Sequence, residues 1–205
     1  MSDPAVEDFE RAICEYTGAP YAIAMKRCCI ALKGCCEFLG VRNVTIPKRT
    51  YIFVPQVLAR SGVLVDFDDR DWSGGYRLEP YPIWDYARRF KPGMYQRNQF
   101  QCLSFHRSKI LGHTEGGAVL TDSWRANDWL RQWRDDGRDR FGCYEGRVMI
   151  GESGLMYPEI AVALRLKLHW LKEYYPSGHH DLPNSDYPDL SLRDWNGVWR
   201  EQQKR

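Results

Sequence analysis

The first part of the chain alternates helical and strand-like segments joined by short links. Between residues 6 and 69, apolar residues recur at helical spacing in three segments and form short apolar runs in three others. The expected elements are helix 6–18, strand 21–25, helix 27–40, strand 43–47, helix 54–62 and strand 63–69. Helices placed between successive strands act as crossovers between parallel strands. The alternation therefore predicts a layered α/β fold.

The remainder of the chain is less regular. We expect further strands at 83–85, 99–105 and 117–122, and helices at 124–138 and 157–175. From Pro176 onward the chain is rich in Pro, Asp, Ser and His, which predicts an irregular tail. Residues 1–150 are therefore expected to form an α/β domain, and residues 151–205 to add a helix and that tail.

Composition excludes several classes of protein. The 205 residues are 43% hydrophobic, which suits one compact domain, and the net charge of +2 gives no general attraction to nucleic acid or to a membrane. No apolar run reaches transmembrane length, and the acidic N-terminus is unlike a signal peptide. The seven cysteines lack C-x-x-C spacing, which argues against a zinc site or a disulfide framework. We expect a cytoplasmic protein without a metal.

Residues 104–122, SFHRSKILGHTEGGAVLTD, place one lysine in a short irregular segment between two strands. A solvated loop lysine needs no such setting. A lysine that holds a cofactor covalently does, because its amine must be partly dehydrated and fixed in direction. Lys109 is therefore a candidate catalytic residue.

Three other features fall at strand ends. Asp85 closes the strand PIWD, Ser104 closes the strand before Lys109, and Cys28-Cys29 lie at a strand-to-helix turn. Ligands of open α/β sheets lie beyond the carboxyl ends of strands, near helix N-termini that favour anions. A phosphate could bind the amides of Cys28 and Cys29 and the Ser104 hydroxyl. Lys109 could form an imine with an aldehyde.

Asp85 could keep a ring nitrogen protonated. These groups together meet the needs of pyridoxal 5'-phosphate (PLP). Two alternatives stay open on the residues alone, since Asp85 could instead cap a following helix and Ser104 could be satisfied by backbone.

The order of several segments resembles the DegT/DnrJ/EryC1/StrS sugar aminotransferases, which are fold-type-I PLP enzymes. The segments are FERAICEYTGAPYAIAM, IALKGCCEFLGV, IPKRTYIF, SGVLVDFD, WDYARRF and SFHRSKILGHTEGGAVLTD, of which S-F-x-x-x-K followed by E-G-G is the most specific. The resemblance implies a three-layer α/β/α sandwich with a mostly parallel sheet. It also implies that Lys109 binds the cofactor covalently, Asp85 pairs with the pyridine nitrogen, Ser104 binds the phosphate and Tyr51 stacks on the ring.

The chain departs from the family pattern in three regions. Arg27-Cys28-Cys29 replaces a Ser-Gly-Thr phosphate turn, and Arg88 replaces a glutamine that follows the aspartate. A strand–helix unit expected between Asp69 and Pro82 is reduced to a short loop, and the C-terminal domain is cut to a helix and a tail. The sequence therefore resembles a shortened member of the family, and Arg88, Cys28 and Cys29 are candidate cofactor contacts.

The resemblance implies transfer of an amino group from an amino acid, such as glutamate, to a keto sugar carried on a nucleotide. It also implies a homodimer. Two alternatives stay open. One is another PLP reaction, such as dehydration of a sugar, which normally accompanies loss of the lysine. The other is a non-catalytic member that binds a ligand or stabilises a partner subunit.

Overall fold

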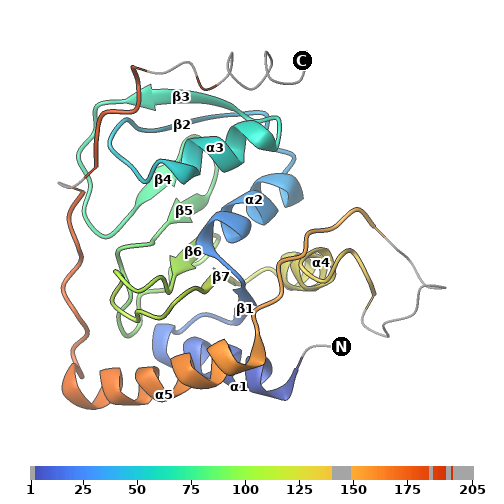
Figure 1. Ribbon diagram of the computed structural model, residues 1–205, viewed down its shortest axis with the longest axis vertical. Coiled ribbons are helices and arrows are strands. Elements are labelled where there is room, and N and C mark those ends of the chain that lie inside the picture. Colours follow the sequence, from blue (N-terminus) through green and yellow to red (C-terminus); the bar gives the residue numbers. More distant parts are fainter. Residues whose placement is uncertain (1–2, 140–148, 185–186, 193–194, 196–205) are drawn as a thin grey trace.

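The protein is described by a computed structural model that covers residues 3–139, 149–184, 187–192 and 195 (Figure 1). The helices are α1 (Pro4–Thr17), α2 (Cys28–Phe38), α3 (Phe53–Arg60), α4 (Trp124–Trp133) and α5 (Pro158–Tyr174). The strands are β1 (Tyr21–Met25), β2 (Asn43–Pro47), β3 (Leu64–Asp68), β4 (Tyr76–Leu78), β5 (Ile83–Asp85), β6 (Phe100–Ser104) and β7 (Gly117–Thr121). Each expected helix and strand is present, and β4 is an addition.

The strands form one continuous arrangement. β1, β7, β6, β5 and β4 are hydrogen-bonded in that order, and β2 pairs with β3. The amides of Thr45 and Glu79 each donate to the other residue's carbonyl, at 2.9 and 3.0 Å, and so link β2 to β4. The strands consequently follow one another as β3-β2-β4-β5-β6-β7-β1 (Figure 1).

The sheet is mixed, whereas a mostly parallel sheet was expected. β2–β3 and β5–β6 pair parallel, but β1–β7, β6–β7 and β4–β5 pair antiparallel. Residues 79–82 join β4 to β5, and a parallel crossover needs a dozen residues or more. The shortening of this region therefore turns β4 into one arm of a hairpin.

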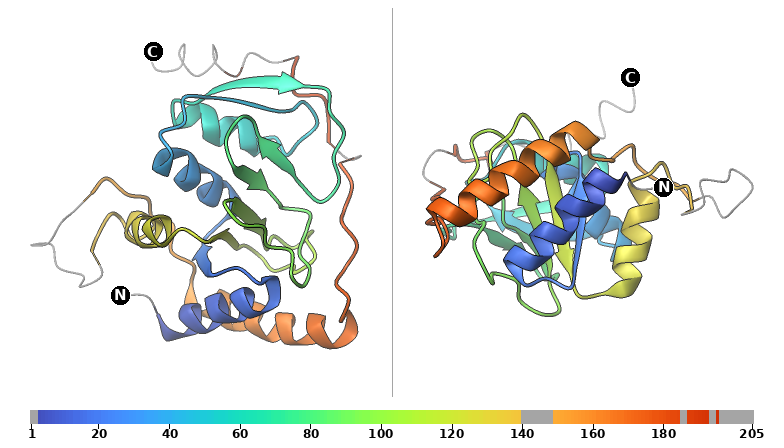
Figure 2. Two further views of the ribbon diagram at one scale, coloured as in Figure 1. Left: turned by 180° about the vertical axis from the view of Figure 1, so that it is seen from behind. Right: turned by 90° about the horizontal axis from the view of Figure 1, so that it is seen from below.

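Helices cover both faces of the sheet, which confirms the three-layer α/β/α architecture. In β1, Ala22 and Ala24 belong to the apolar cluster formed with α1 and α5, whereas Ile23 and Met25 belong to the cluster formed with α2, α3 and α4. Successive side chains of a strand point to opposite faces, so both faces of β1 are buried. Figure 2 shows α1 and α5 lying side by side.

Local sequence signals set the ends and the packing of the helices. The Asp3 carboxylate accepts a hydrogen bond from the Ala5 amide at 2.8 Å, and α1 ends at Gly18, whose φ of 78° favours glycine. Inside α2, a side chain at Gly34 would overlap Trp133 and Leu130. Gly34 therefore allows α4 to pack closely on α2.

The described residues between 176 and 192 are irregular, as expected, but they follow a defined path. We call the described residues of 176–192 the C-terminal strap. The strap leaves α5 and runs along the side of the sheet at which β3 ends (Figure 1). Among the described residues, none of the helices is both long and apolar enough to cross a membrane.

Candidate active site

Lys109 lies in the loop of the β6–β7 hairpin. Ser104 and Gly117 form the last pair of the ladder, and the loop is closed by a hydrogen bond of 2.7 Å from the His113 amide to the Phe105 carbonyl. The Lys109 amide donates to the His106 carbonyl at 2.8 Å. The backbone of the lysine is therefore held within a tight turn at the end of β6.

Gly117 brings this loop against the N-terminus of α2. A Cβ atom at Gly117 would overlap the backbone of Arg27 and Cys28. Only a residue without a side chain permits so close an approach of the two backbones. The E-G-G sequence before β7 thus has a steric role in assembling the site.

A cavity of about 490 Å³ lies at this edge of the sheet. Its volume falls within the range that is usual for small-ligand sites. All the site residues predicted from the sequence line it, namely Lys109, Asp85, Ser104, Tyr51, Cys28, Cys29 and Arg88. Tertiary structure therefore brings together residues that lie up to 81 positions apart in the chain, from Cys28 to Lys109.

Asp85 is a buried carboxylate at the end of β5, with 4% of its surface exposed. One carboxylate oxygen accepts from the Ala87 amide at 2.9 Å, and the other accepts from the Tyr76 hydroxyl at 3.1 Å. Burial raises the pKa of Asp85, while the Ala87 amide and the nearby Lys109 ammonium act in the opposite direction. A further cation beside this carboxylate would stabilise its charged form.

Tyr76 is a site residue that the sequence analysis missed. Its hydroxyl is buried between Asp85 and Thr50, and the Thr50 and Tyr76 oxygens are 2.6 Å apart. Burial raises the pKa of Tyr76 well above its usual value, so the phenol keeps its proton and donates a hydrogen bond to the Asp85 carboxylate. No sequence motif links a tyrosine to an aspartate nine positions later.

The N-terminus of α2 forms one wall of the cavity. Arg27 is the N-cap residue, and its side chain makes no capping hydrogen bond but pairs with Glu115 at 3.5 Å. The Cys28 and Cys29 thiols are buried, and burial raises the pKa of Cys29 to about 12. These thiols are therefore protonated, and the features of this wall suited to an anion are the helix N-terminus and the Arg27 side chain.

Ser104 lies opposite, at the end of β6, and its hydroxyl oxygen is 3.5 Å from the His106 amide. Lys26, the residue before the Arg27-Cys28-Cys29 turn, does not line the cavity. Its amine is 3.4 Å from the Tyr157 hydroxyl.

Tyr51 and Arg88 occupy the outer part of the cavity. The Tyr51 side chain is 53% exposed. Arg88 contacts the C-terminal strap, since its Nε donates to the Tyr187 hydroxyl at 3.2 Å and its guanidinium lies 4.6 Å from the centre of the Tyr187 ring. Arg88 therefore links the cavity wall to the strap.

Tyr187 is the second residue that the sequence analysis missed. Its hydroxyl accepts from the Lys109 amine at 3.4 Å. Tyr187 lies in the tail, where no periodicity or motif pointed to the site.

The sequence model of the DegT/DnrJ/EryC1/StrS aminotransferase family matches residues 1–74 and 93–175, which is more than half of the chain. The chain belongs to the DegT/DnrJ/EryC1/StrS aminotransferase family. The match includes Lys109, Ser104 and the N-terminus of α2, and it omits the segment that carries Asp85 and Arg88. None of the curated proteins searched is a significant match to this sequence.

Solved structures share the fold at low sequence identity. An aminotransferase of this family from Brucella abortus aligns with a TM-score of 0.71 at 22% identity, over 83% of this chain and 60% of that one. For 3-amino-5-hydroxybenzoic acid synthase the TM-score is 0.71 at 19% identity, over 83% and 57%. For DesI, solved in the presence of its TDP-sugar product, the TM-score is 0.67 at 20% identity, over 86% and 54%.

These likenesses show a fold-type-I aminotransferase architecture. They also show that this chain spans less than two thirds of the length of those relatives.

Proposed function

We propose that the protein is a PLP-dependent aminotransferase. The observation that carries the proposal is the convergence of Lys109, Asp85 and Ser104 on one cavity at the N-terminus of α2. An amine, a buried carboxylate and an anion-binding helix terminus are the three different groups that PLP requires of a protein.

The residues present fit this cofactor. The N-terminus of α2, with the Ser104 hydroxyl, would hold the phosphate. Asp85 would accept a hydrogen bond from the protonated ring nitrogen, and the positive ring would offset the cost of burying the carboxylate, which its raised pKa reflects. Tyr51, at the outer edge, would contact the ring face.

When bound, PLP supplies an aldehyde that reacts with amines and a ring that accepts an electron pair from the substrate carbon. The Lys109 Nζ atom would hold the cofactor covalently until a donor amine displaces it. The freed Nζ would then carry a proton to and from the reacting carbons as a general acid and base. Asp85 would keep the ring nitrogen protonated throughout.

The proposed substrates are a keto sugar, probed first in a nucleotide-linked form, and an amino acid donor such as glutamate. Support comes from the family and from DesI, whose structure was solved with a TDP-sugar product. We also propose a homodimer in the cytoplasm. The relative that makes an amino-hydroxybenzoic acid provides a reason to include cyclic ketones other than sugars in the screen.

A specific observation favours a second candidate. The N-terminus of α2, where the phosphate would bind, carries the protonated Cys28 and Cys29 thiols, which are weak hydrogen-bond donors. If the backbone amides alone do not retain the phosphate, the protein would be a non-catalytic member that binds a ligand or supports a partner subunit.

Reduction of the PLP-loaded protein with borohydride tests the proposal. The wild type, Lys109→Ala and the control Lys172→Ala are each loaded with PLP and freed of excess. We expect wild type and control to keep a visible absorption band that borohydride abolishes, with the pyridoxyl mass on the peptide containing Lys109. The alanine variant at 109 should show neither.

Equal and low PLP retention by wild type and Lys109→Ala would overturn the proposal and favour the non-catalytic candidate. A pyridoxyl mass on another lysine would overturn the assignment of Lys109 as the cofactor-binding residue but not the proposal that the protein binds PLP.

A further inference from the structure

Backbone hydrogen bonds hold the C-terminal strap at several points. The Gly74 amide donates to the Leu182 carbonyl at 3.0 Å, and the Leu182 amide donates to the Arg88 carbonyl at 3.0 Å. Further along, the Leu190 amide donates to the Lys48 carbonyl at 2.8 Å, and the Leu190 side chain is buried. The strap is therefore a fixed part of the fold on both sides of Tyr187.

Ion pairs reinforce both attachments. Asp181 accepts from the Arg89 guanidinium at 2.5 and 3.0 Å. At the other end, Asp189 pairs with Lys48 at 3.2 Å, and Lys48 also pairs with Asp69 at 2.9 Å. Hydrogen bonds from Ser191, together with Lys48, lower the pKa of Asp189 to about 2.

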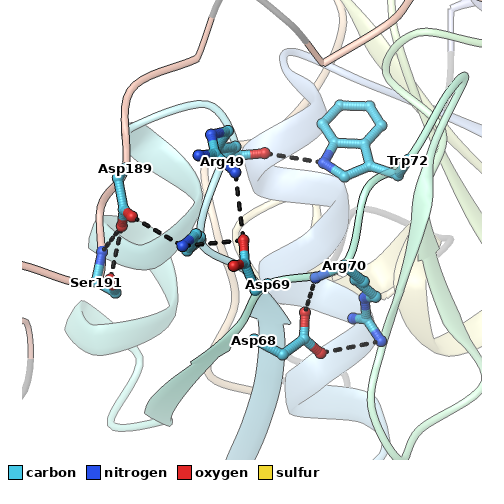
Figure 3. A network of polar contacts seen from close by, with 8 residues as sticks. Arg49, Asp68, Asp69, Arg70, Trp72, Asp189 and Ser191 are labelled. Carbon is cyan, nitrogen blue, oxygen red and sulfur yellow. Dashed lines mark hydrogen bonds and ion pairs between the residues drawn. The ribbon is translucent and has the colours of Figure 1, made fainter.

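Figure 3 shows this network extending from Asp189 to Trp72. Asp69 accepts from Arg49 at 3.3 Å, and the Arg49 carbonyl accepts from the Trp72 indole nitrogen at 2.8 Å. The Trp72 ring in turn stacks on the Tyr187 ring, with ring centres 6.0 Å apart and an interplanar angle of 22°. The strap anchor and the ring contact are thus parts of one connected set of residues.

Tyr187 is held by two side chains, Trp72 and Arg88. Trp72 stacks on its ring, Arg88 lies over the ring, and the Arg88 Nε donates to its hydroxyl. The same hydroxyl accepts from the Lys109 amine, so a rigidly placed oxygen faces the end of a flexible four-carbon side chain.

We propose that Tyr187 is a positioning residue for Lys109, delivered to the active site by the C-terminal strap. The inference rests on the proposed function, and it assigns a role to a segment that the family match, ending at residue 175, does not include. The hydroxyl limits the directions in which the Nζ atom can point and keeps it inside the cavity. Orientation of a reacting group raises the rate of a bond-forming step.

The step concerned is the capture of PLP. The Lys109 ammonium first loses one proton to solvent. The neutral amine then forms a bond to the aldehyde carbon, and its two remaining hydrogens leave with the aldehyde oxygen as water. No oxidant or reductant takes part. Loss of the Tyr187 hydroxyl should slow this step while leaving the pocket that binds the phosphate and ring intact.

The kinetics of PLP capture test the inference. The rate at which the visible band appears is measured against PLP concentration, which gives a half-saturating concentration and a limiting rate. For Tyr187→Phe we expect a limiting rate lower by about five- to tenfold, the equivalent of one ordinary hydrogen bond, with the half-saturating concentration changed by less than about twofold. Tyr174→Phe, the same change at a 63% exposed side chain on α5, should alter neither quantity.

A second variant tests the role of the strap while leaving the Tyr187 side chain unchanged. Asp189→Asn loosens the strap anchor without touching the cavity, and it should lower the limiting rate in the wild type but not further in Tyr187→Phe. Thermal unfolding of each variant establishes that it is folded.

The outcomes separate the two proposals. Absence of PLP capture by the wild type would overturn the proposed function. Normal capture by the wild type, with Tyr187→Phe indistinguishable from Tyr174→Phe, would overturn the role of Tyr187 alone. An unchanged limiting rate with a raised half-saturating concentration would also overturn it, since that result describes a pocket wall.

Discussion

The two sides of the active-site cavity are built in different ways. Lys109, Ser104 and the N-terminus of α2 lie within the segments that match the family, on regular elements or on a hairpin loop. Asp85 and Tyr187 lie within 75–92 and 176–205, which the family match omits, and these segments contact each other through Arg88 and Arg89. The matched side is held by the regular elements α2, β6 and β7. On the unmatched side Asp85 also stands at a strand end, but the irregular strap that carries Tyr187 depends in addition on individual side-chain contacts.

This difference has a physical consequence. A strand end or a helix terminus is positioned by many backbone hydrogen bonds and by a buried face, so single side chains matter little to it. An irregular segment depends on a few polar contacts, each of which can be removed by one substitution. Changes to the matched frame should therefore affect stability, and changes to the unmatched side should affect cofactor binding.

The largest expected effect is on the stability of the helices and strands that match the family. Glu10 is buried and joins α1 to β1 and α4, because it accepts from the Ala24 amide at 2.8 Å, from Arg134 at 2.6 Å and from Arg131 at 2.7 Å. Removing one partner of a buried ion pair costs about 3–5 kcal/mol. We expect Glu10→Ala to lose about that much unfolding free energy in urea denaturation.

The exposed Glu7, one turn earlier in α1, provides the matched control. A loss below about 1 kcal/mol for Glu10→Ala would contradict the view that this network supports the frame. At temperatures where the variant is folded, its half-saturating PLP concentration should equal that of the wild type.

The next variant, Asp85→Asn, should weaken PLP binding without lowering stability. Asp85→Asn removes the charge proposed to pair with the protonated ring, and it should weaken PLP retention by about 150-fold, the lower end of the cost of removing one partner of a buried charge pair. Stability of the empty protein should not fall, since asparagine can still accept from the Ala87 amide. Asp66→Asn, at an exposed position on β3, is the control, and equilibrium dialysis measures retention.

The raised pKa of Asp85 also predicts a pH dependence. The pKa of Asp85 is raised above its ordinary value of 3.8, so the folded protein holds the Asp85 proton more tightly than the unfolded chain does. Stability of the empty protein should therefore fall as the pH rises through the folded pKa, and Asp85→Asn should lack this component. A wild-type profile identical to that of the variant would contradict the burial argument.

A smaller effect is expected at Tyr76. Tyr76→Phe removes the hydroxyl that donates to Asp85 and leaves the ring in place. Loss of one ordinary hydrogen bond corresponds to about a five- to tenfold loss of PLP affinity. Tyr81→Phe, in the adjacent β4–β5 turn, should show no loss in the same titration, and an equal loss in both variants would assign the effect to packing.

Much of the frame could be predicted from local sequence. The strands at 21–25 and 43–47 were predicted with the bounds that the structure has, because a short apolar run between two helical segments is typical of a buried strand. β4 was missed, since three residues beside Gly75 carry no periodicity. The mixed sheet was missed for a related reason, because strand direction depends on whether a four-residue link can cross over.

The site was predicted unevenly. Asp85 and Ser104 were predicted as candidate site residues because they stand at the ends of strands, and the carboxyl ends of neighbouring strands meet at one edge of a sheet. Lys109 was predicted because it is a single lysine in a short irregular segment between two strands. Tyr76 and Tyr187 were not, because their partners lie 9 and 78 positions away and no spacing encodes those contacts.

The sequence by itself thus determined the layered α/β class, the order of the elements and the chemical groups at the strand ends. These properties follow from hydrophobic periodicity and turn residues, which act over a few positions. Only the tertiary structure decided the direction of β4, the hydroxyl that supports Asp85 and the strap that carries Tyr187 to Lys109. Contacts of this kind depend on where the folded backbone brings distant segments together, which local patterns do not record.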